Sequence, residues 1–538
     1  MGDRIANLDD YRRLRTSFEW QCPEHFNFGF DVVDRWAADR PDRIAIHWVG
    51  PKDERTVTFA ELGARSSQLA AALGNLGLAR GDKVLVILPR VIPWWESLVG
   101  VFKAGMVAIP GTTLLTARDI AHRAQAAQAV AIVTDEAAAT KVEQVTHQLP
   151  GLQHKILVSD NARTGWHSYE KLLATAGAPE PVRTRSNDPA LLYFTSGTTG
   201  MPKMVLHSHA SYGVGHQVTG RLWLDLREED LHWNISDTGW AKAAWSSLFG
   251  PWICGTSLFV QHGVGKFQPA DVLKYLAKYP ITTMCSAPTI YRVLVQQDLS
   301  EFRPLALRHC VAAGEPLNPE VIATWKRATG LTIRDGYGQT ETVLLCGNFP
   351  GIEVKPGSMG LPSPGIDLAI IDDHGERLPP GKEGDIGVRV QPARPLGMFT
   401  EYWHDPGATT RAFRNGWYVT GDCGYTDDDG YFWFVGRADD VITSSAYRIG
   451  PFEVESALIE HPAVVEAAVI GKPDSVRGQI VKAFVVLTDE YSATEELKTE
   501  LQEHVKRTTA PYKYPREIEF ISELPKTTSE KIRRVELR

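Results

Sequence analysis

The first 190 residues alternate short apolar runs with longer stretches in which apolar residues recur at helical spacing. The apolar runs predict strands over Ile44–Val49, Lys83–Leu88, Val107–Pro110, Val130–Thr134 and Ile156–Ser159. The longer stretches predict helices over Phe59–Leu76 and Pro93–Lys103. Strands that alternate with helices usually pair in parallel and are covered on both faces, so an α/β fold is predicted.

The same alternation continues from about residue 188 to 345. Strands are predicted over Leu191–Thr195, Ser257–Val260, Thr282–Ser286 and His309–Ala312. This part therefore predicts a second parallel-type α/β subdomain.

The pattern changes between about residues 357 and 437. Leu368–Ile371 and Asp385–Val390 flank a segment rich in Asp, Gly and Pro, which predicts hairpins and a barrel-like β subdomain. From Asp439 onward the pattern is that of a small α+β domain. Its helices are predicted over Glu453–Glu460 and Glu495–Arg507, and its strands over Val464–Ile470, Val481–Leu487 and Glu517–Ile521. We therefore expect a large N-terminal domain, 1–438, and a small C-terminal domain, 439–538.

Composition and charge narrow the class of protein. Of 538 residues, 43% are apolar and 23% charged, which excludes a disordered chain. The net charge of −8 disfavours nucleic acid as a partner. No apolar run approaches the length of a membrane span, and the start lacks the apolar core of a secretory signal. Six scattered cysteines predict buried thiols rather than disulfides, so we expect a cytoplasmic protein. The oligomeric state, monomer or homodimer, stays open.

The most informative segment runs from Tyr193 to Lys203. An apolar strand leads into Thr195, Ser196, Gly197, Thr198, Thr199 and Gly200, and Lys203 follows. Small residues let successive backbone N–H groups turn inward around an anion, hydroxyl groups add donors, and the lysine adds a point charge. Such a loop is also typical of a polar turn between strands, and it matches neither the Walker A nor the dinucleotide pattern.

The loop resembles the T-S-G-T-T-G-x-P-K signature of the adenylate-forming (ANL) superfamily, which includes AMP-dependent acyl-CoA synthetases. Other motifs of that family follow in the same order. They are Gly336–Glu341 (G-Y-G-x-T-E), Tyr418–Asp422 (Y-x-T-G-D), Gly436–Asp440 (the interdomain hinge) and Leu524–Arg533 (P-K-T-x-x-G-K-I). Ser236–Trp252 and Tyr447–Glu455 look like the medium-chain acyl-CoA synthetases.

The resemblance implies adenylation of a carboxylic acid by ATP, followed by transfer of the acyl group to CoA. It assigns catalytic roles to Lys531, Lys203 and Thr340, and Mg²⁺ binding to Glu341. ATP or AMP would be bound by residues 195–200, Lys203, Gly314, Glu315, Pro316, Asp335, Gly336, Tyr337, Thr340, Asp422, Arg437, Arg448 and Lys531. Asp422 would accept both ribose hydroxyls, and Tyr337 would stack on adenine.

The resemblance also implies an acyl site, a CoA site and a mobile C-terminal domain. Trp240, Gly314 and Gly336 would line the acyl site, where glycines leave volume for a substrate tail. Ser445, Ala446, Tyr447 and Arg477 would contact CoA, with Lys513 and Arg516 as further phosphate contacts. The small domain would rotate about Asp439 between the two half-reactions.

The sequence departs from the family pattern at two positions, and two alternative functions stay open. Glu530 stands where the family usually has Gly, and Ala446 also replaces a usual Gly, which makes thiol transfer harder to infer than adenylation. One alternative is an acyl-AMP ligase that delivers its product to a carrier protein. The other is a non-catalytic scaffold that binds nucleotide or acyl ligand.

Overall fold

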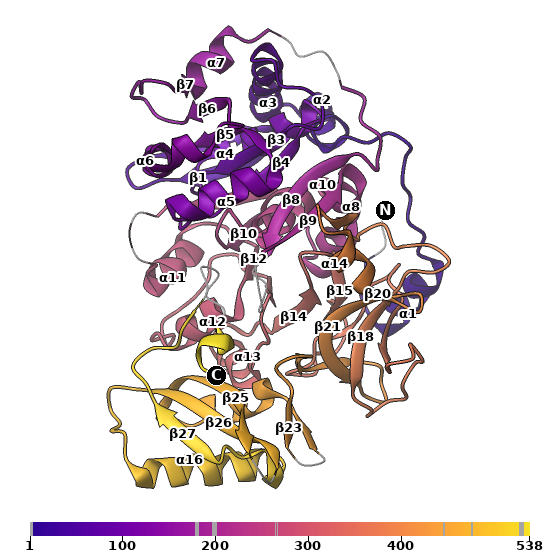
Figure 1. The fold of residues 1–538 in the computed structure, drawn as a ribbon, viewed down its shortest axis with the longest axis vertical. Coiled ribbons are helices and arrows are strands. Elements are labelled where there is room, and N and C mark those ends of the chain that lie inside the picture. Colours follow the sequence, from indigo (N-terminus) through magenta and orange to yellow (C-terminus); the bar gives the residue numbers. More distant parts are fainter. Residues whose placement is uncertain are drawn as a thin grey trace.

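The computed structural model describes residues 4–177, 182–195, 202–263, 265, 267–444, 447–474, 477–526 and 532–538. The described residues form three sheets that, with their helices, make up the larger part of the chain, and a fourth sheet near the C-terminus (Figure 1). The predicted architecture is confirmed: the described residues form two α/β subdomains, a β subdomain and a small α+β domain. The two α/β subdomains exchange segments, because residues 44–58 pair into the second sheet and residues 189–208 into the first.

The first sheet has the strand order β19-β9-β8-β4-β3-β5-β6-β7. The bounds are β3 Lys83–Ile87, β4 Val107–Pro110, β5 Ala129–Thr134, β6 His154–Leu157, β7 His167–Ser168, β8 Pro189–Thr195, β9 Lys203–Ser208 and β19 Glu401–Tyr402. Strands β3 to β8 pair with one another in parallel, whereas β9 pairs antiparallel with both β8 and β19. Strand β6 begins two residues before the predicted start, because His154 and Lys155 are polar residues near the sheet edge.

The second sheet has the order β16-β15-β14-β13-β12-β10-β11-β1-β2. The bounds are β1 Ile44–Val49, β2 Glu54–Thr58, β10 Leu231–Ile235, β11 Ser257–Gln261, β12 Thr283–Ser286, β13 His309–Ala313, β14 Ile333–Gly338, β15 Leu344–Gly347 and β16 Leu361–Pro362. Its centre is parallel, but β2, β15 and β16 pair antiparallel at the two ends. The polar edge strand β2 has no apolar run that would have predicted it.

Helices separate and cover these two sheets. The principal ones are α3 Phe59–Asn75, α4 Ile92–Lys103, α5 Ala117–Ala127, α6 Glu136–Val145, α10 Gly250–Ile253, α11 Pro269–Lys278, α12 Pro288–Val295 and α13 Pro319–Thr329. Val84 and Val86 of β3 share a core cluster with α3, α4 and β11, whereas Leu85 and Ile87 pack with α5 and α6. Phe259 of β11 packs with α11 to α13 on the far side. The result is an α-β-α-β-α stack, in which alternate residues of each strand face different layers.

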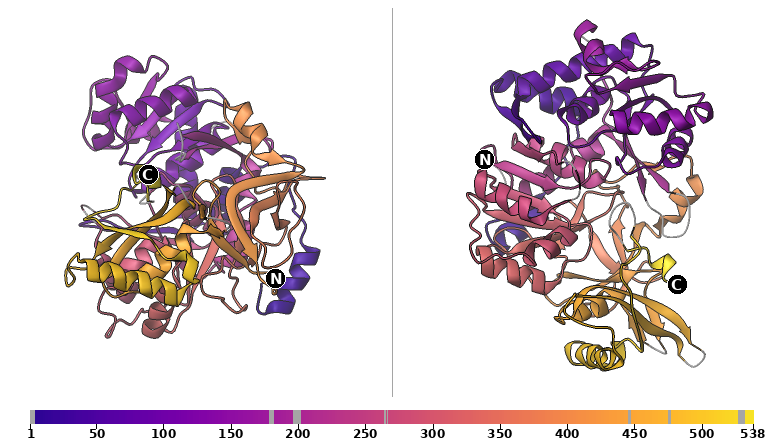
Figure 2. Two further views of the ribbon diagram at one scale, coloured as in Figure 1. Left: turned by 60° about the horizontal axis from the view of Figure 1, so that its bottom comes forward. Right: turned by 90° about the vertical axis from the view of Figure 1, so that its left-hand side faces the viewer.

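The β subdomain and the C-terminal domain complete the molecule (Figure 2). The first contains β17 Leu368–Ile371, β18 Gly384–Arg389, β20 Phe413–Arg414, β21 Trp417–Thr426 and β22 Phe432–Arg437, with the N-terminal helix α1 Leu8–Ser17 packed nearby. The second contains β23 Ile442–Ser444, β24 Tyr447–Ile449, β25 Val464–Asp474, β26 Gly478–Leu487, β27 Glu517–Phe520, α15 Pro451–Ile459 and α16 Glu495–Thr508. Its main core uses only residues from Ile442 onward, while the predicted domain boundary at 438/439 stays a prediction.

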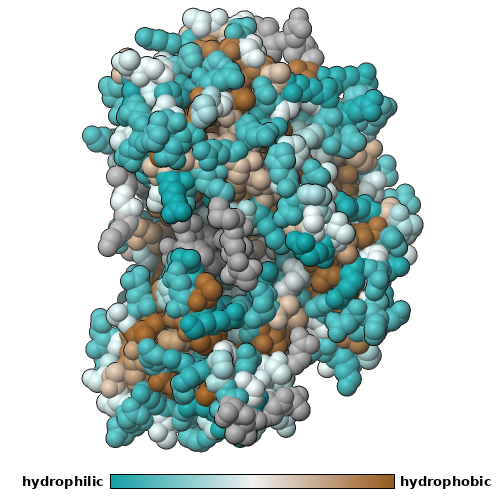
Figure 3. Space-filling model, viewed as in Figure 1, coloured by the Kyte–Doolittle hydropathy of each residue, from teal (hydrophilic) through white to brown (hydrophobic). Residues whose placement is uncertain are grey.

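The polarity of one face of the surface (Figure 3) and the apolar character of the helices bear on whether the chain could span a membrane. The side seen in Figure 3 is predominantly hydrophilic. Among the described residues, no helix has the length and apolar character needed to cross a bilayer.

Candidate active site

The predicted phosphate loop joins two paired strands. Thr195 at the end of β8 lies opposite Lys203 at the start of β9, and the Thr195 hydroxyl donates to the Lys203 carbonyl at 3.4 Å. The predicted contacts from Ser196, Gly197, Thr198, Thr199 and Gly200 lie outside the described residues. Because β8 and β9 are paired in register, Thr195 and Lys203, which flank the loop in the sequence, lie opposite each other.

Lys203 lies beside the carboxylate predicted to bind metal. Its Nζ is 4.6 Å from the centroid of the Tyr402 ring, and the Tyr402 hydroxyl donates to Glu341 Oε1 at 2.8 Å. Burial raises the pKa of Glu341, while the Tyr402 hydrogen bond and the charges of Lys203 and Arg437 oppose the shift. Tyr402, which the sequence motifs did not indicate, therefore bridges two of the predicted site residues.

Asp422 lies at the centre of a second polar cluster. Its Oδ1 accepts from Arg437 at 3.1 Å, and its Oδ2 accepts from Gln339 Nε2 at 2.7 Å and from the Tyr337 hydroxyl at 2.5 Å. Gln339 is the variable residue of the G-Y-G-x-T-E motif, and its amide oxygen accepts from the Tyr418 hydroxyl at 2.9 Å. Three predicted residues thus meet here, and the Tyr337 hydroxyl points to Asp422. Its stacking on adenine stays a prediction.

Thr340 is held through its backbone by a buried histidine. His207 Nε2 lies 2.7 Å from the Thr340 carbonyl, and Nδ1 lies 3.0 Å from the Ser211 hydroxyl. Burial lowers the pKa of His207 to about 3, so the ring is neutral near pH 7. The neutral ring then donates from Nε2 to Thr340 and accepts at Nδ1. This pairing ties β9 to the segment that carries Thr340 and Glu341.

The buried His207 predicts a pH-dependent stability. Its native pKa lies below that of the unfolded chain, so the unfolded state binds more protons as pH falls from about 6.5 to about 3, and stability is lost over that window. When the pH falls from about 7 to about 5, the unfolding free energy of the parent should decrease. That of His207→Gln should decrease by about 2 kcal/mol less. Urea titrations at both pH values measure this. His374→Gln, at an exposed position, is the control; an unchanged pH slope in His207→Gln would contradict the assignment.

The residues predicted to flank adenine lie at the ends of β13 and β14. Gly314 has φ +104, a conformation that favours glycine, and a Cβ there would lie 3.5 Å from Lys242 Nζ. Lys242 is itself buried, and its ammonium donates to the Ala313 carbonyl. Glu315 accepts from Thr289 at 2.7 Å and Arg292 at 2.8 Å. Pro316 follows it directly in the chain. Lys242 lies within the Ser236–Trp252 motif but was not predicted as a site residue.

Asp335 and Gly336 lie in the middle of β14. Burial raises the pKa of Asp335 well above its usual range, and its Oδ1 accepts from the Gly336 N–H at 2.9 Å. A Cβ on Gly336 would lie 2.4 Å from Trp223 Cζ2. A side chain at this position would collide with the Trp223 indole, and the role of Gly336 in lining the acyl site stays a prediction. Trp240 is half-buried at the start of the short helix α9 Ala241–Ala244.

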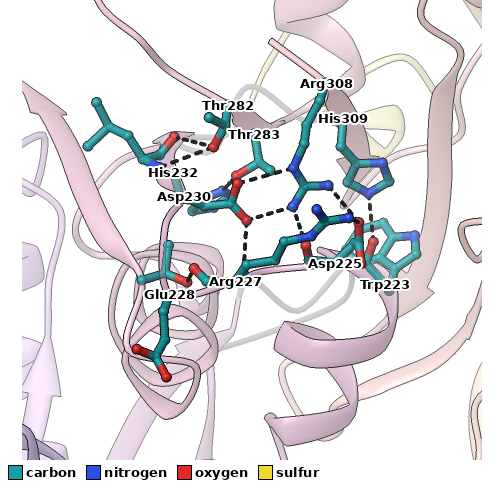
Figure 4. A network of polar contacts seen from close by, with 12 residues as sticks. Trp223, Asp225, Arg227, Glu228, Asp230, His232, Thr282, Thr283, Arg308 and His309 are labelled. Carbon is teal, nitrogen blue, oxygen red and sulfur yellow. Dashed lines mark hydrogen bonds and ion pairs between the residues drawn. The ribbon is translucent and has the colours of Figure 1, made fainter. Parts of the chain in front are cut away.

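A polar network fixes Trp223 in this position (Figure 4). His309 Nε2 lies 2.7 Å from the Trp223 carbonyl. Arg308 forms ion pairs of 2.6 Å with both Asp225 and Asp230. Because His309 is the first residue of β13 and Arg308 directly precedes it, the network anchors the Trp223 backbone to the sheet.

The C-terminal domain carries the predicted CoA and hinge residues. Asp439 lies in the turn between β22 and β23, and its carbonyl accepts from Arg538 at 3.1 Å. Tyr447 is half exposed and stacks on Tyr512, with 4.1 Å between ring centroids. The Arg477 N–H donates to Asp474 Oδ1 at 2.8 Å.

The two further residues predicted to contact phosphate, Lys513 and Arg516, bind neighbouring side chains of the same domain. Lys513 pairs with Glu453 at 2.5 Å, and Arg516 donates to the Tyr514 hydroxyl at 2.8 Å. Ser445, Ala446, Glu530, Lys531 and the Arg448 side chain lie outside the described residues. Their predicted roles therefore stay predictions.

The region around Glu341 suits a metal ion whose ligands come mainly from the phosphate groups of a bound nucleotide. In the part of the chain that the structure describes, no cluster of three or more His, Cys, Asp or Glu residues is arranged to hold a metal ion. Mg²⁺ needs only one or two carboxylates when phosphate oxygens and water supply the remaining ligands. The buried Glu341 carboxylate beside Lys203 fits that requirement.

Comparison with known proteins agrees with this geometry. Residues 33–403 match the family model "AMP-binding enzyme", and residues 453–531 match "AMP-binding enzyme C-terminal domain". The chain is 51% identical to human acyl-coenzyme A synthetase ACSM3, mitochondrial, over 99% of this chain and 92% of the relative. It is 50% identical to rat acyl-coenzyme A synthetase ACSM4, mitochondrial, over 99% of this chain and 93% of the relative.

Solved structures show the same fold. The anthranilate CoA ligase AuaEII in complex with anthranoyl-AMP is similar with a TM-score of 0.87 and 32% identity, covering 96% of this chain and 97% of that one. A benzoate CoA ligase from Burkholderia xenovorans LB400 is similar with a TM-score of 0.84 and 27% identity, covering 95% of this chain and 100% of that one. With matches to both family models and to relatives along nearly the whole chain, this protein belongs to the AMP-binding enzyme family, in its medium-chain acyl-CoA synthetase branch.

Proposed function

We propose that this chain is an AMP-forming acyl-CoA ligase. It would convert a carboxylic acid, ATP and CoA into acyl-CoA, AMP and diphosphate through an acyl-adenylate. The observation that carries the proposal is that Lys203 and Glu341 form one polar cluster, close to a second cluster that contains Asp422 and Arg437. The relatives named acyl-coenzyme A synthetase support it.

The arrangement assigns each group a task in adenylation. The attack of a carboxylate on the α-phosphate adds negative charge to an anionic centre, so positioned cations and donors must stabilise it. Lys203 and the loop hydroxyls would hold the outer phosphates, and Thr340 the α-phosphate. Asp422 would accept the ribose hydroxyls, with Gln339 and Arg437 fixing its orientation. Mg²⁺ at Glu341 would supply further positive charge to the triphosphate.

The acid we propose is medium-chain, branched or aromatic. Trp240, Gly314 and Gly336 would line its site, and Trp223 would close the wall behind Gly336. Neither the chain length nor the pathway follows from these contacts.

Free CoA is the acceptor we favour over a carrier protein. The test is to supply a medium-chain acid, ATP and Mg²⁺ with either CoA or a phosphopantetheinylated carrier and to measure AMP. We expect AMP and acyl-CoA with free CoA. AMP formed only with the carrier would establish the alternative, and none with either acceptor would favour a scaffold.

The compartment is also part of the proposal. All six cysteines lie in the described part of the chain and are free thiols, which fits a reducing compartment such as the cytoplasm. The relatives compared above are named mitochondrial, and the mitochondrial matrix would suit free thiols equally. Fractionation of the native cell distinguishes the two.

A further inference from the structure

A groove of about 520 Å³ lies on the large domain, and none of the residues that line it is among those proposed to hold ATP. Its walls come from residues 21–35, the helix α8 His209–Gly213, the π-helix η3 Thr219–Trp223 and α10. Phe26, Phe30 and Ile253 provide apolar surface within it. The volume lies in the range of small-molecule sites, about 300–1,000 Å³.

The groove carries more positive than negative charge. Arg35 and Arg221 both line it. Among the residues that the structure describes, neither guanidinium forms an ion pair with a carboxylate. Asp31 also lines the groove, but its Oδ2 already accepts from the Asn27 N–H at 2.6 Å. Two guanidinium groups beside an apolar wall are complementary to an anion that carries an apolar chain.

Two π-helices contribute to the same groove. Phe30 and Asp31 belong to η1 Gly29–Asp34, and Arg221 belongs to η3. π-Helices are rare and occur frequently at functional sites. η3 also carries Trp223, whose indole fills the space behind Gly336. A ligand on Arg221 would therefore contact the element that forms one wall of the proposed acyl site.

We propose that this groove binds a soluble, single-chain anionic amphiphile, with its charged head on Arg35 and Arg221 and its chain along Phe26, Phe30 and Ile253. This binding goes beyond the ligase function and does not depend on it. The anion replaces the water that solvates the two exposed guanidinium groups, and the chain covers apolar surface.

Isothermal titration of the full-length chain with sodium octane-1-sulfonate tests the proposal. This probe has no carboxylate and cannot be adenylated, and no ATP is added, so the result is independent of pyrophosphate exchange. We expect the double variant Arg35→Ala/Arg221→Ala to bind at least about tenfold more weakly than the parent, as expected for lost charge-assisted contacts. Arg118→Ala, which removes an exposed arginine on α5, should bind like the parent.

Two further measurements complete the design. Ethanesulfonate, with the same charge and a short chain, should bind more weakly than octane-1-sulfonate if the apolar wall contributes. Thermal melting checks that the double variant is folded. Parent-like affinity and stoichiometry in the double variant would assign the binding to another site and overturn the proposal, as would the absence of binding to the parent.

Discussion

Replacing Lys531 with alanine is expected to slow acyl-adenylate formation by about 10²–10³-fold, the usual cost of losing one group that stabilises the transition state. The same variant should still convert supplied acyl-adenylate and CoA into acyl-CoA at nearly the parental rate. The reason is that the lysine would bridge the carboxylate and the α-phosphate only in the first half-reaction. Pyrophosphate exchange measures the first step and thioester formation the second.

The residues around Lys531 are anchored to the C-terminal domain. Lys526 pairs with Glu466 at 2.8 Å and forms a β-bridge with Ile532. Arg534 makes bonds of 2.6 and 2.8 Å to Glu455. The described residues on either side of Lys531 are therefore fixed to the C-terminal domain.

Lys526→Ala is the matched control for this experiment. It removes the same charge five positions earlier in the sequence, at a residue that is already paired with Glu466. Exchange should therefore change by less than about threefold, since a partly exposed ion pair contributes little. An equal loss of both half-reactions in Lys531→Ala would contradict the proposed rotation about Asp439.

Replacing Glu341 with glutamine is expected to lower the rate of pyrophosphate exchange by about 100-fold or more, because a negative metal ligand is lost. Glutamine is isosteric and can still accept the hydrogen bond from the Tyr402 hydroxyl, so the fold should be preserved. The raised pKa of Glu341 shows that burial disfavours the free carboxylate, and a bound cation would restore it. Exchange is measured over a range of Mg²⁺ concentrations, with thermal melting as the check on folding.

Glu401→Gln provides the control for the loss of charge. Glu401 precedes Tyr402 on β19, and neighbouring residues of a strand point to opposite faces. Its replacement should leave exchange within about twofold of the parent, as surface substitutions usually have small effects. If both variants lose activity equally, the effect comes from the loss of negative charge in this region and not from the loss of a metal ligand.

Much of the fold was predictable because its core strands are continuous apolar runs. Lys83–Leu88 and Val107–Pro110 match β3 and β4, and Phe59–Leu76 matches α3 with its Thr58 N-cap. The polar edge strand β2 was missed, because a strand that is largely exposed needs no apolar pattern.

The site was predictable only where its residues belong to local motifs. Lys203, Glu341 and Asp422 are marked by their sequence neighbours, and the structure places them in two polar clusters close enough for the charge of Arg437 to act on Glu341. Tyr402 contacts Glu341 across a sequence separation of 61 residues, and its neighbours form no motif. Trp223 fills the space behind Gly336 from a separate π-helix, so only the packing reveals it.

Following one oxygen atom from the acid into AMP tests most directly whether the reaction passes through an acyl-adenylate. The acid is labelled with ¹⁸O in both carboxylate oxygens and incubated with the protein, ATP, Mg²⁺ and CoA, and the products are examined by mass spectrometry. If the carboxylate attacks the α-phosphate and the thiol then attacks the acyl carbon, the C–O bond breaks and AMP carries one ¹⁸O atom. Unlabelled AMP, or label in the diphosphate, would contradict an acyl-adenylate intermediate.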